Sequence, residues 1–243
     1  MKLISTTVSY EGFNQANQTE TLLKIAERAI EKASKLDADI LVLPAGFFMC
    51  RNSALRDENA LSLIEIAKQF NIAIIFGIDQ QEKNLSDDYV QEIIEERLPF
   101  WCYAWSRNDG IKYWNQRSTN SANQKYASDK ICNDLRTITV NGEKLAILMC
   151  GEIFNRRIRD TLANNSKNIK VVADVAHKGR QFRIDGSMRI LANSGLSSVC
   201  SVHVQKEFAM KRCYRASGTK LSTTTYDTYV YGPPRIEMKL WTF

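Results

Sequence analysis

The 243-residue sequence predicts an α/β fold in which two packed, mixed β-sheets carry helices on their outer faces. Two observations predict it. Strand-like and helix-like apolar patterns alternate over the first third of the chain, and a helical crossover is the usual way to return to a parallel strand. The middle third contains two hairpin patterns, which add antiparallel strands. The sequence has no internal repeat and no low-complexity linker, so residues 1–243 are expected to form one domain.

The first third alternates strands with helices. Residues 2–10 alternate in character and predict a strand, and residues 19–36 place apolar side chains at three- and four-residue steps, which predicts an amphipathic helix. Residues 39–44 then predict a buried strand that Pro44 ends. Residues 59–70 repeat the helical spacing, and residues 72–78 predict a second buried strand.

Two hairpins are expected in the middle of the chain. Residues 98–106 and 111–114 are strand-like and flank a short polar turn. Residues 137–140 and 144–150 flank Asn141-Gly142, a pair that accepts the positive φ of a tight hairpin turn. These antiparallel strands make the expected sheets mixed.

The last part of the chain restores the alternation of helices and strands. A helix after Cys150, a strand over residues 169–175, a helix over residues 184–193 and a strand over residues 198–204 are predicted. No element is assigned to the Thr- and Tyr-rich tail that follows. The most loop-like segment is Glu82 to Asp88.

Composition excludes several classes of protein. No apolar run approaches the roughly 18 to 20 residues of a membrane span, and the opening residues lack the pattern of a signal peptide, so a soluble, cytoplasmic protein is expected. Six cysteines without a CxxC pair and only two histidines encode neither a disulfide framework nor a metal site. The net charge of +6 is not gathered on one face, so a nucleic-acid partner is not expected.

Cys150 is the most informative candidate for chemistry. It ends a strand-like run, Gly151 permits a sharp turn, and polar Glu152 and Asn155 precede a helical stretch. Backbone N–H groups at such a turn favour a thiolate and can bind an oxyanion. A cysteine that ends a strand is also often a small buried side chain, and both interpretations stay open.

Four segments resemble the carbon-nitrogen hydrolase family, the nitrilase superfamily, in their order and rough spacing. They are ADILVLPAGFF, DGIKYWNQRST, LAILMCGEIFN and MRILANSG. The resemblance implies a four-layer α-β-β-α sandwich with two mixed β-sheets, assembled as a homodimer or larger oligomer. It also implies hydrolysis of nitriles, amides or carbamoyl groups by a Cys nucleophile, a Glu base and a Lys, without a cofactor.

Only part of that triad is present here. The family's Cys falls on Cys150, and the acidic residue two places beyond it falls on Glu152. The family's Glu falls on Ala45, whose methyl group cannot accept a proton. The family's Lys falls on Arg117, which keeps the positive charge but holds its proton too tightly to exchange it. The resemblance therefore implies an incomplete site with low activity.

Several groups are candidates for a substitute base. Glu152 is nearest in sequence. The weaker candidates are Asp57, Glu58 and Glu143, whose alternative interpretation is an exposed surface charge. His177 follows a strand at the expected site end of the sheet, where it could bind substrate or pair with Cys150, or could simply be a loop histidine.

A small-molecule pocket is expected beside Cys150. Phe47 and Phe48 follow Ala45 and are expected to wall it, and Arg117 offers a planar positive group suited to an anionic ligand. The sequence therefore favours a divergent hydrolase of an amide- or nitrile-like small molecule. The alternatives are an inactive binding or scaffold protein with the same fold and, from charge alone, a nucleic-acid-binding protein.

Overall fold

The computed structural model describes residues 1–10, 13, 18–80, 98–118, 132, 134–177, 181–204, 213–214, 224–229 and 234–243. The strands are β1 (Lys2–Ser9), β2 (Ile40–Val42), β3 (Phe48–Cys50), β4 (Ala73–Gln80), β5 (Phe100–Ser106), β6 (Gly110–Asn115), β7 (Thr137–Val140), β8 (Glu143–Met149), β9 (Val171–Ala176), β10 (Ser197–Val204), β11 (Cys213–Tyr214), β12 (Thr224–Tyr229) and β13 (Arg235–Thr242). The helices are α1 (Thr19–Lys35), α2 (Ser53–Gln69), α5 (Arg156–Asn164) and α6 (Gln181–Asn193), with the 3₁₀ helices η3 (Cys150–Phe154) and η4 (Ser166–Asn168).

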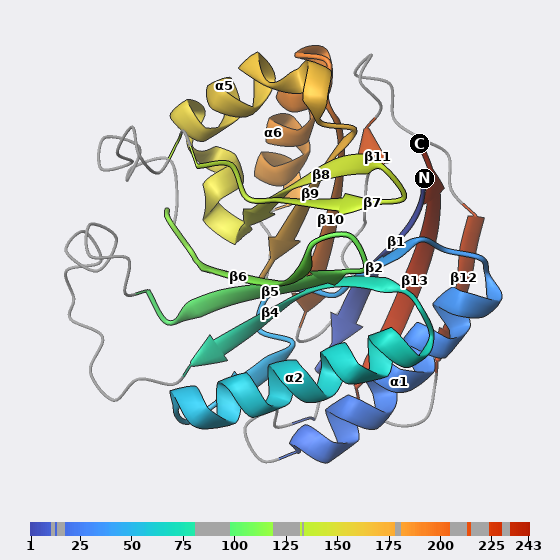
Figure 1. Cartoon of the computed structure of the whole chain (residues 1–243). Coiled ribbons are helices and arrows are strands. Elements are labelled where there is room, and N and C mark those ends of the chain that lie inside the picture. The colour runs from blue at the N-terminus through green and yellow to red at the C-terminus, as the bar shows by residue number, and fades with distance from the viewer. Residues whose placement is uncertain are drawn as a thin grey trace.

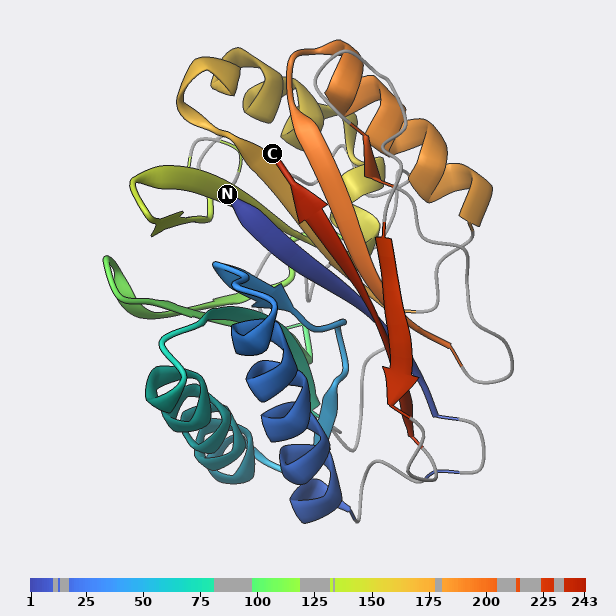
Figure 2. The same cartoon turned by 90° about the vertical axis from the view of Figure 1, so that its right-hand side faces the viewer.

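All of these strands belong to one curled sheet, whose main path runs β6-β5-β4-β2-β1-β10-β9-β8-β7. β1 divides it into two halves. β13 pairs with β1 along its whole length, so β2 and β10 share the other edge of β1, at Leu3–Ser5 and at Thr7–Ser9 respectively. The β1–β13 pairing also brings the two chain ends together (Figure 2). The halves therefore diverge from β1 and face one another.

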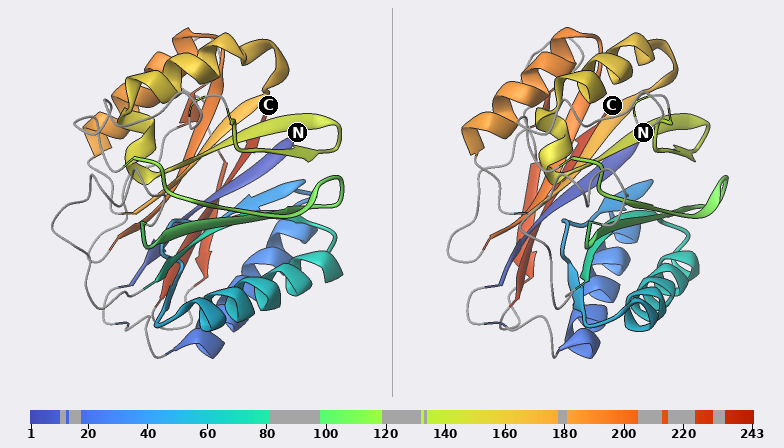
Figure 3. Two further views of the ribbon diagram at one scale, coloured as in Figure 1. Left: turned by 60° about the vertical axis from the view of Figure 1, so that its left-hand side comes forward. Right: turned by 90° about the vertical axis from the view of Figure 1, so that its left-hand side faces the viewer.

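The molecule has four layers (Figures 1 and 3). One apolar cluster packs α1 and α2 against the β4 half, through side chains such as Leu22, Ile64 and Phe76. A second fills the space between the two halves, and a third packs α5 and α6 against the β9 half. This arrangement confirms the predicted α-β-β-α sandwich, with the refinement that its two mixed sheets are joined through β1.

Most predicted elements are present with shifted ends. Asn141 and Gly142 adopt φ values of 50° and 79°, as the predicted hairpin requires. α2 begins at Ser53, six residues before the predicted start, because the Asn52 side chain caps it by accepting the N–H of Leu55. β3 and the tail strands were not predicted, although β13 has alternating burial. The predicted loop Glu82 to Asp88 lies outside the described residues.

Six neighbouring strands of the main path form one run of parallel strands. β8, β9, β10, β1, β2 and β4 are joined by parallel ladders, so their carboxyl ends open at the same edge of the curled sheet. In open α/β sheets this edge is where ligands bind. None of the helices in the described part of the chain is long and apolar enough to cross a membrane.

Candidate active site

Cys150 stands on a strained turn. β8 ends at Met149, and Cys150 begins η3 with φ +48°, a left-handed conformation that is uncommon for a residue other than glycine. Cys150 is partly exposed, whereas the other described free cysteines, Cys50, Cys102, Cys132 and Cys200, are buried. The turn therefore lifts this thiol out of the core.

Glu152 anchors the same turn. Its carboxylate accepts the backbone N–H groups of Met149, at 2.9 Å, and of Arg117. It also forms a bidentate pair with Arg136 at 2.7 and 2.9 Å, and both side chains of that pair are at most 2% exposed. A carboxylate that accepts four hydrogen bonds has no site left for a substrate proton. The geometry thus shows Glu152 holding the turn and argues against the predicted catalytic role.

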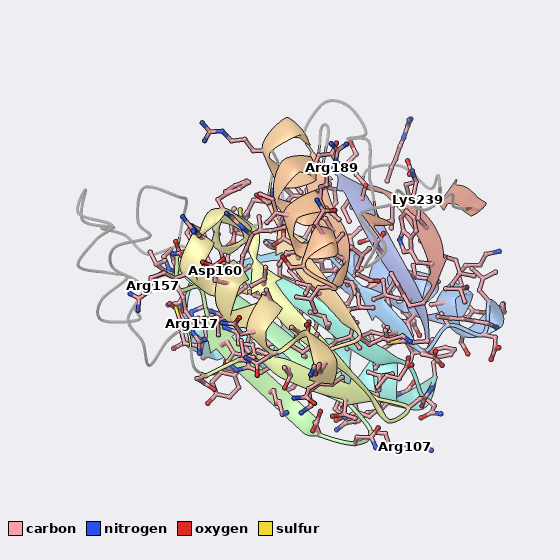
Figure 4. All side chains as sticks on the ribbon, turned by 90° about the horizontal axis from the view of Figure 1, so that it is seen from above. Arg107, Arg117, Arg157, Asp160, Arg189 and Lys239 are labelled. Carbon is pink, nitrogen blue, oxygen red and sulfur yellow. The ribbon has the colours of Figure 1, made fainter. Side chains whose placement is uncertain are left out.

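The contacts of Arg117 also differ from those expected for its predicted role. Its guanidinium donates to the backbone carbonyl and the carboxylate of Asp134, at 2.5 and 2.7 Å. Arg117, Ile158 and Leu162 line a cavity of about 20 Å³ against α5. Figure 4 labels Arg117 together with the α5 residues Arg157 and Asp160. Burial, followed by Arg136, lowers the pKa of Arg117. These contacts engage its guanidinium with Asp134.

The residues around Ala45 are core residues. Ala45 is 2% exposed and belongs to the cluster between the two halves of the sheet. Phe47 and Phe48 are 0% and 1% exposed and pack edge to face at 4.9 Å beneath α1 and α2. The prediction that these two rings wall an open pocket is therefore wrong, because both are sealed in the α–β interface.

Two glycines shape the segment between β2 and β3. Gly77 accepts the N–H of Phe47 and donates to the carbonyl of Pro44. A Cβ on Gly77 would lie 2.4 Å from the Cα of Ala45. Gly46 has φ +58°, and a Cβ there would lie 2.7 Å from Oδ2 of Asp79. The segment thus closes against β4 and leaves just enough room for the Asp79 carboxylate.

His177 lies beside Cys150. The β8–β9 ladder ends at the pair Met149 and Val175, which places Cys150 one residue and His177 two residues beyond it. Cys150 is among the groups that raise the pKa of His177, which agrees with this adjacent placement. On its other side, Nε2 of His177 lies 2.9 Å from both carboxylate oxygens of Asp79, which projects from β4 in the opposite half of the sheet. The structure thus brings a thiol, an imidazole and a carboxylate together.

The two histidines of the chain are neighbours, and their pKa values are shifted in opposite directions. Their rings are 5.4 Å apart. Burial opposes the charge on His177, but the Asp79 carboxylate and then Cys150 outweigh it and raise its pKa to about 10. Burial and the nearby His177 lower the pKa of His203 to about 4. At neutral pH, His177 is therefore protonated and His203 is neutral.

These shifts predict a stability maximum close to pH 6.5, the ordinary pKa of histidine. His177 binds its proton more tightly in the folded state, so its stabilising effect is complete below that pH and is lost as the pH rises toward 10. His203 is harder to protonate in the folded state, so its contribution is lost as the pH falls toward 4. Urea unfolding across this range measures both effects. His177→Gln should flatten the alkaline loss and should also reduce the acid loss, because the charge of His177 helps to lower the pKa of His203. His203→Gln should flatten only the acid loss; an unchanged alkaline loss in His177→Gln contradicts the assignment.

Sequence reasoning missed Asp79 and His203. A signal for both was present, because Asp79 directly follows the buried strand predicted over residues 72–78, and His203 lies at the end of the strand predicted over residues 198–204. These are carboxyl ends of parallel strands, as are the positions of Cys150 and His177. Within the described ranges, no group of three His, Cys, Asp or Glu side chains is arranged to hold a metal ion.

Known proteins resemble this chain in structure, whereas the sequence comparisons find no match. No family model matches the sequence, and no curated protein matches it. The structure is similar to an amidase from Nesterenkonia sp., with a TM-score of 0.68 at 13% identity, covering 99% of this chain and 90% of that one. A variant of the Nesterenkonia AN1 amidase, described as belonging to the nitrilase superfamily, gives the same values.

A further variant of that amidase carries the acetamide moiety of fluoroacetamide, covalently added at its active-site cysteine. Its TM-score is 0.68 at 14% identity, with 99% of this chain and 90% of that one covered. These likenesses show that the chain has the fold of the nitrilase-superfamily amidases, as the resemblance of the four segments predicted.

Proposed function

We propose that this protein hydrolyses a carbon–nitrogen bond of a small amide through a thioester formed on Cys150. The observation that carries the proposal is the partly exposed Cys150 thiol on a left-handed turn, placed at the end of β8 beside His177 at the end of β9. A nucleophile beside a basic group that a third side chain orients is the general signature of covalent catalysis. The shared fold supports amides as the substrate class, because the similar structures are amidases.

The chemistry proceeds in two steps. The Cys150 sulfur attacks the amide carbon, and the resulting tetrahedral oxyanion collapses with cleavage of the C–N bond, which leaves a thioester and releases ammonia or an amine. Water then attacks the thioester, the C–S bond breaks, and a carboxylic acid leaves. Two protons must move: the thiol proton to the leaving nitrogen, and a proton of the attacking water to the leaving sulfur.

The substrate is expected to be small, and an anionic group is not part of the proposal, since the Arg117 guanidinium that favoured one is engaged by Asp134. A homodimer or larger oligomer and a cytoplasmic location remain predictions from the resemblance and from composition. An inactive binding protein is the alternative that the following experiment distinguishes.

Fluoroacetamide labelling tests the proposal. The compound carries both an amide and a weak leaving group, so it is expected to modify an activated cysteine that binds amides. Burial raises the pKa values of the Cys50 and Cys132 thiols and raises that of Cys102 to about 12, which keeps all three protonated. Peptide mapping after labelling near neutral pH should find Cys150 modified first. Cys50→Ala is the control and should label normally; labelling of Cys150 only after denaturation contradicts the proposal.

A further inference from the structure

The carboxylate missing at Ala45 has a counterpart elsewhere in the site. Asp79 reaches the site from β4, the strand against which the Ala45 segment folds. Gly46, the residue after Ala45, leaves the space that the Asp79 carboxylate occupies. The carboxylate that the resemblance implies at position 45 is thus absent, and the neighbouring strand places the Asp79 carboxylate beside that segment.

We propose that Asp79, His177 and Cys150 form a Cys-His-Asp catalytic arrangement. It supplies the proton transfers for which position 45, an alanine, has no carboxylate. The inference rests on the proposed function, because it assigns the base for the same reaction. His177 is the catalytic residue that exchanges protons with the thiol and the substrate. Asp79 is a positioning residue that orients the ring and holds its positive charge.

The geometry fixes the direction of each proton transfer. Nε2 of His177 lies 2.9 Å from both oxygens of Asp79, so its proton is held there. Nδ1 is then the ring nitrogen left to accept the proton of the Cys150 thiol. Asp79 and His177 are 16% and 20% exposed, so their ion pair is only partly screened by water.

The surroundings of the ring favour the same charge state. The Phe100 ring packs against His177 at 5.0 Å between centroids, and His203 packs at 5.4 Å. His203 is neutral, so it adds no competing positive charge. The charged and titratable groups that act on His177 are therefore Asp79 from β4, Cys150 from η3, His203 from β10 and the buried Asp174 from β9.

The proton balance closes over one cycle. In the resting site His177 already holds the proton of the Cys150 thiol, as an imidazolium–thiolate pair, and the thiolate attacks the amide carbon. The protonated ring gives this proton to the leaving nitrogen as the C–N bond breaks. Neutral His177 then takes a proton from water as the water oxygen bonds to the thioester carbon and forms the second tetrahedral intermediate. It returns that proton to the sulfur when the C–S bond breaks. Asp79 stays ionised throughout.

The pH profile of iodoacetamide alkylation at Cys150 tests the arrangement without requiring turnover. In the wild-type protein, alkylation should persist to about pH 6, because the neighbouring imidazolium stabilises the thiolate. His177→Gln should react roughly 10²-fold more slowly there, since a thiol that titrates near pH 8.5 is only about 1/300 ionised at pH 6. Asp79→Asn should lower the alkylation rate of Cys150 at pH 6 about tenfold. The control is Asp160→Asn, an exposed carboxylate on α5 that should react as wild type.

The outcomes separate this inference from the proposed function. Wild-type pH profiles in folded His177→Gln and Asp79→Asn overturn the arrangement, even if Cys150 remains the labelled nucleophile. If either variant fails to fold by circular dichroism, His177→Gly with added imidazole is the second test. Restoration of alkylation at pH 6 by imidazole supports the arrangement, and its absence in a folded His177→Gly overturns it. Amide turnover that survives Cys150→Ala contradicts the proposed function instead.

Discussion

Arg136→Met is expected to lower the free energy of unfolding by about 3–5 kcal/mol, the largest loss of stability predicted for a single substitution in this chain. Arg136 and Glu152 are 2% and 1% exposed at their side chains and form a bidentate pair. Removing the guanidinium leaves the Glu152 carboxylate buried with only backbone donors. Urea unfolding monitored by circular dichroism measures the loss.

The control for this prediction is Arg156→Met, which breaks an exposed pair with Asp160 on α5. Exposed pairs contribute little, so its effect should be within about 1 kcal/mol. The double variant Arg136→Met/Glu152→Leu should recover part of the loss, because it removes the unpaired charge. Equal losses in the two single variants would mean that the buried pair does not stabilise the turn that carries Cys150.

Gly46→Ala is expected to slow the alkylation of Cys150 at pH 6 at least tenfold, with a stability loss of about 1–2 kcal/mol. The new Cβ would lie 2.7 Å from Oδ2 of Asp79 and 3.2 Å from Cε1 of His203. The Asp79 carboxylate must move, and its hydrogen bond to His177 is weakened. Iodoacetamide kinetics and urea unfolding on the same preparation measure the two effects separately.

Gly142→Ala is a matched control for that substitution. Gly142 has φ +79°, so alanine there has a similar backbone strain, but no atom lies within 4 Å of the new Cβ. The control should lose stability by a similar amount and should keep the alkylation rate. If both variants slow alkylation equally, the effect comes from general destabilisation and not from displacement of Asp79.

The layers of the fold follow from local patterns in the sequence. The buried runs around Leu41 and Ile75 and the amphipathic pattern of residues 19–36 each specify an element, and right-handed crossovers specify how those elements stack. β13 escaped prediction because its alternation was masked by a polar composition, with Glu237 and Lys239 on the face opposite the buried Ile236 and Met238.

The site was only half predictable, for a physical reason. The turn at Cys150 is local, and its strand end, glycine and following polar residues are visible in the sequence. Asp79 and His177 are 98 residues apart in the sequence, and their contact joins opposite halves of the curled sheet. No periodicity encodes such a contact. The contacts of Arg117 escaped prediction for the same reason, because its partner Asp134 lies in a separate segment of the chain.

The most direct measurement is mass spectrometry of the protein during turnover of a small acyl amide, quenched with acid within one cycle. The account predicts one acyl group on the peptide that contains Cys150, its loss at longer times as the carboxylic acid appears, and no adduct or product with Cys150→Ala. Product formation without an acyl group on Cys150, and undiminished in Cys150→Ala, would contradict it.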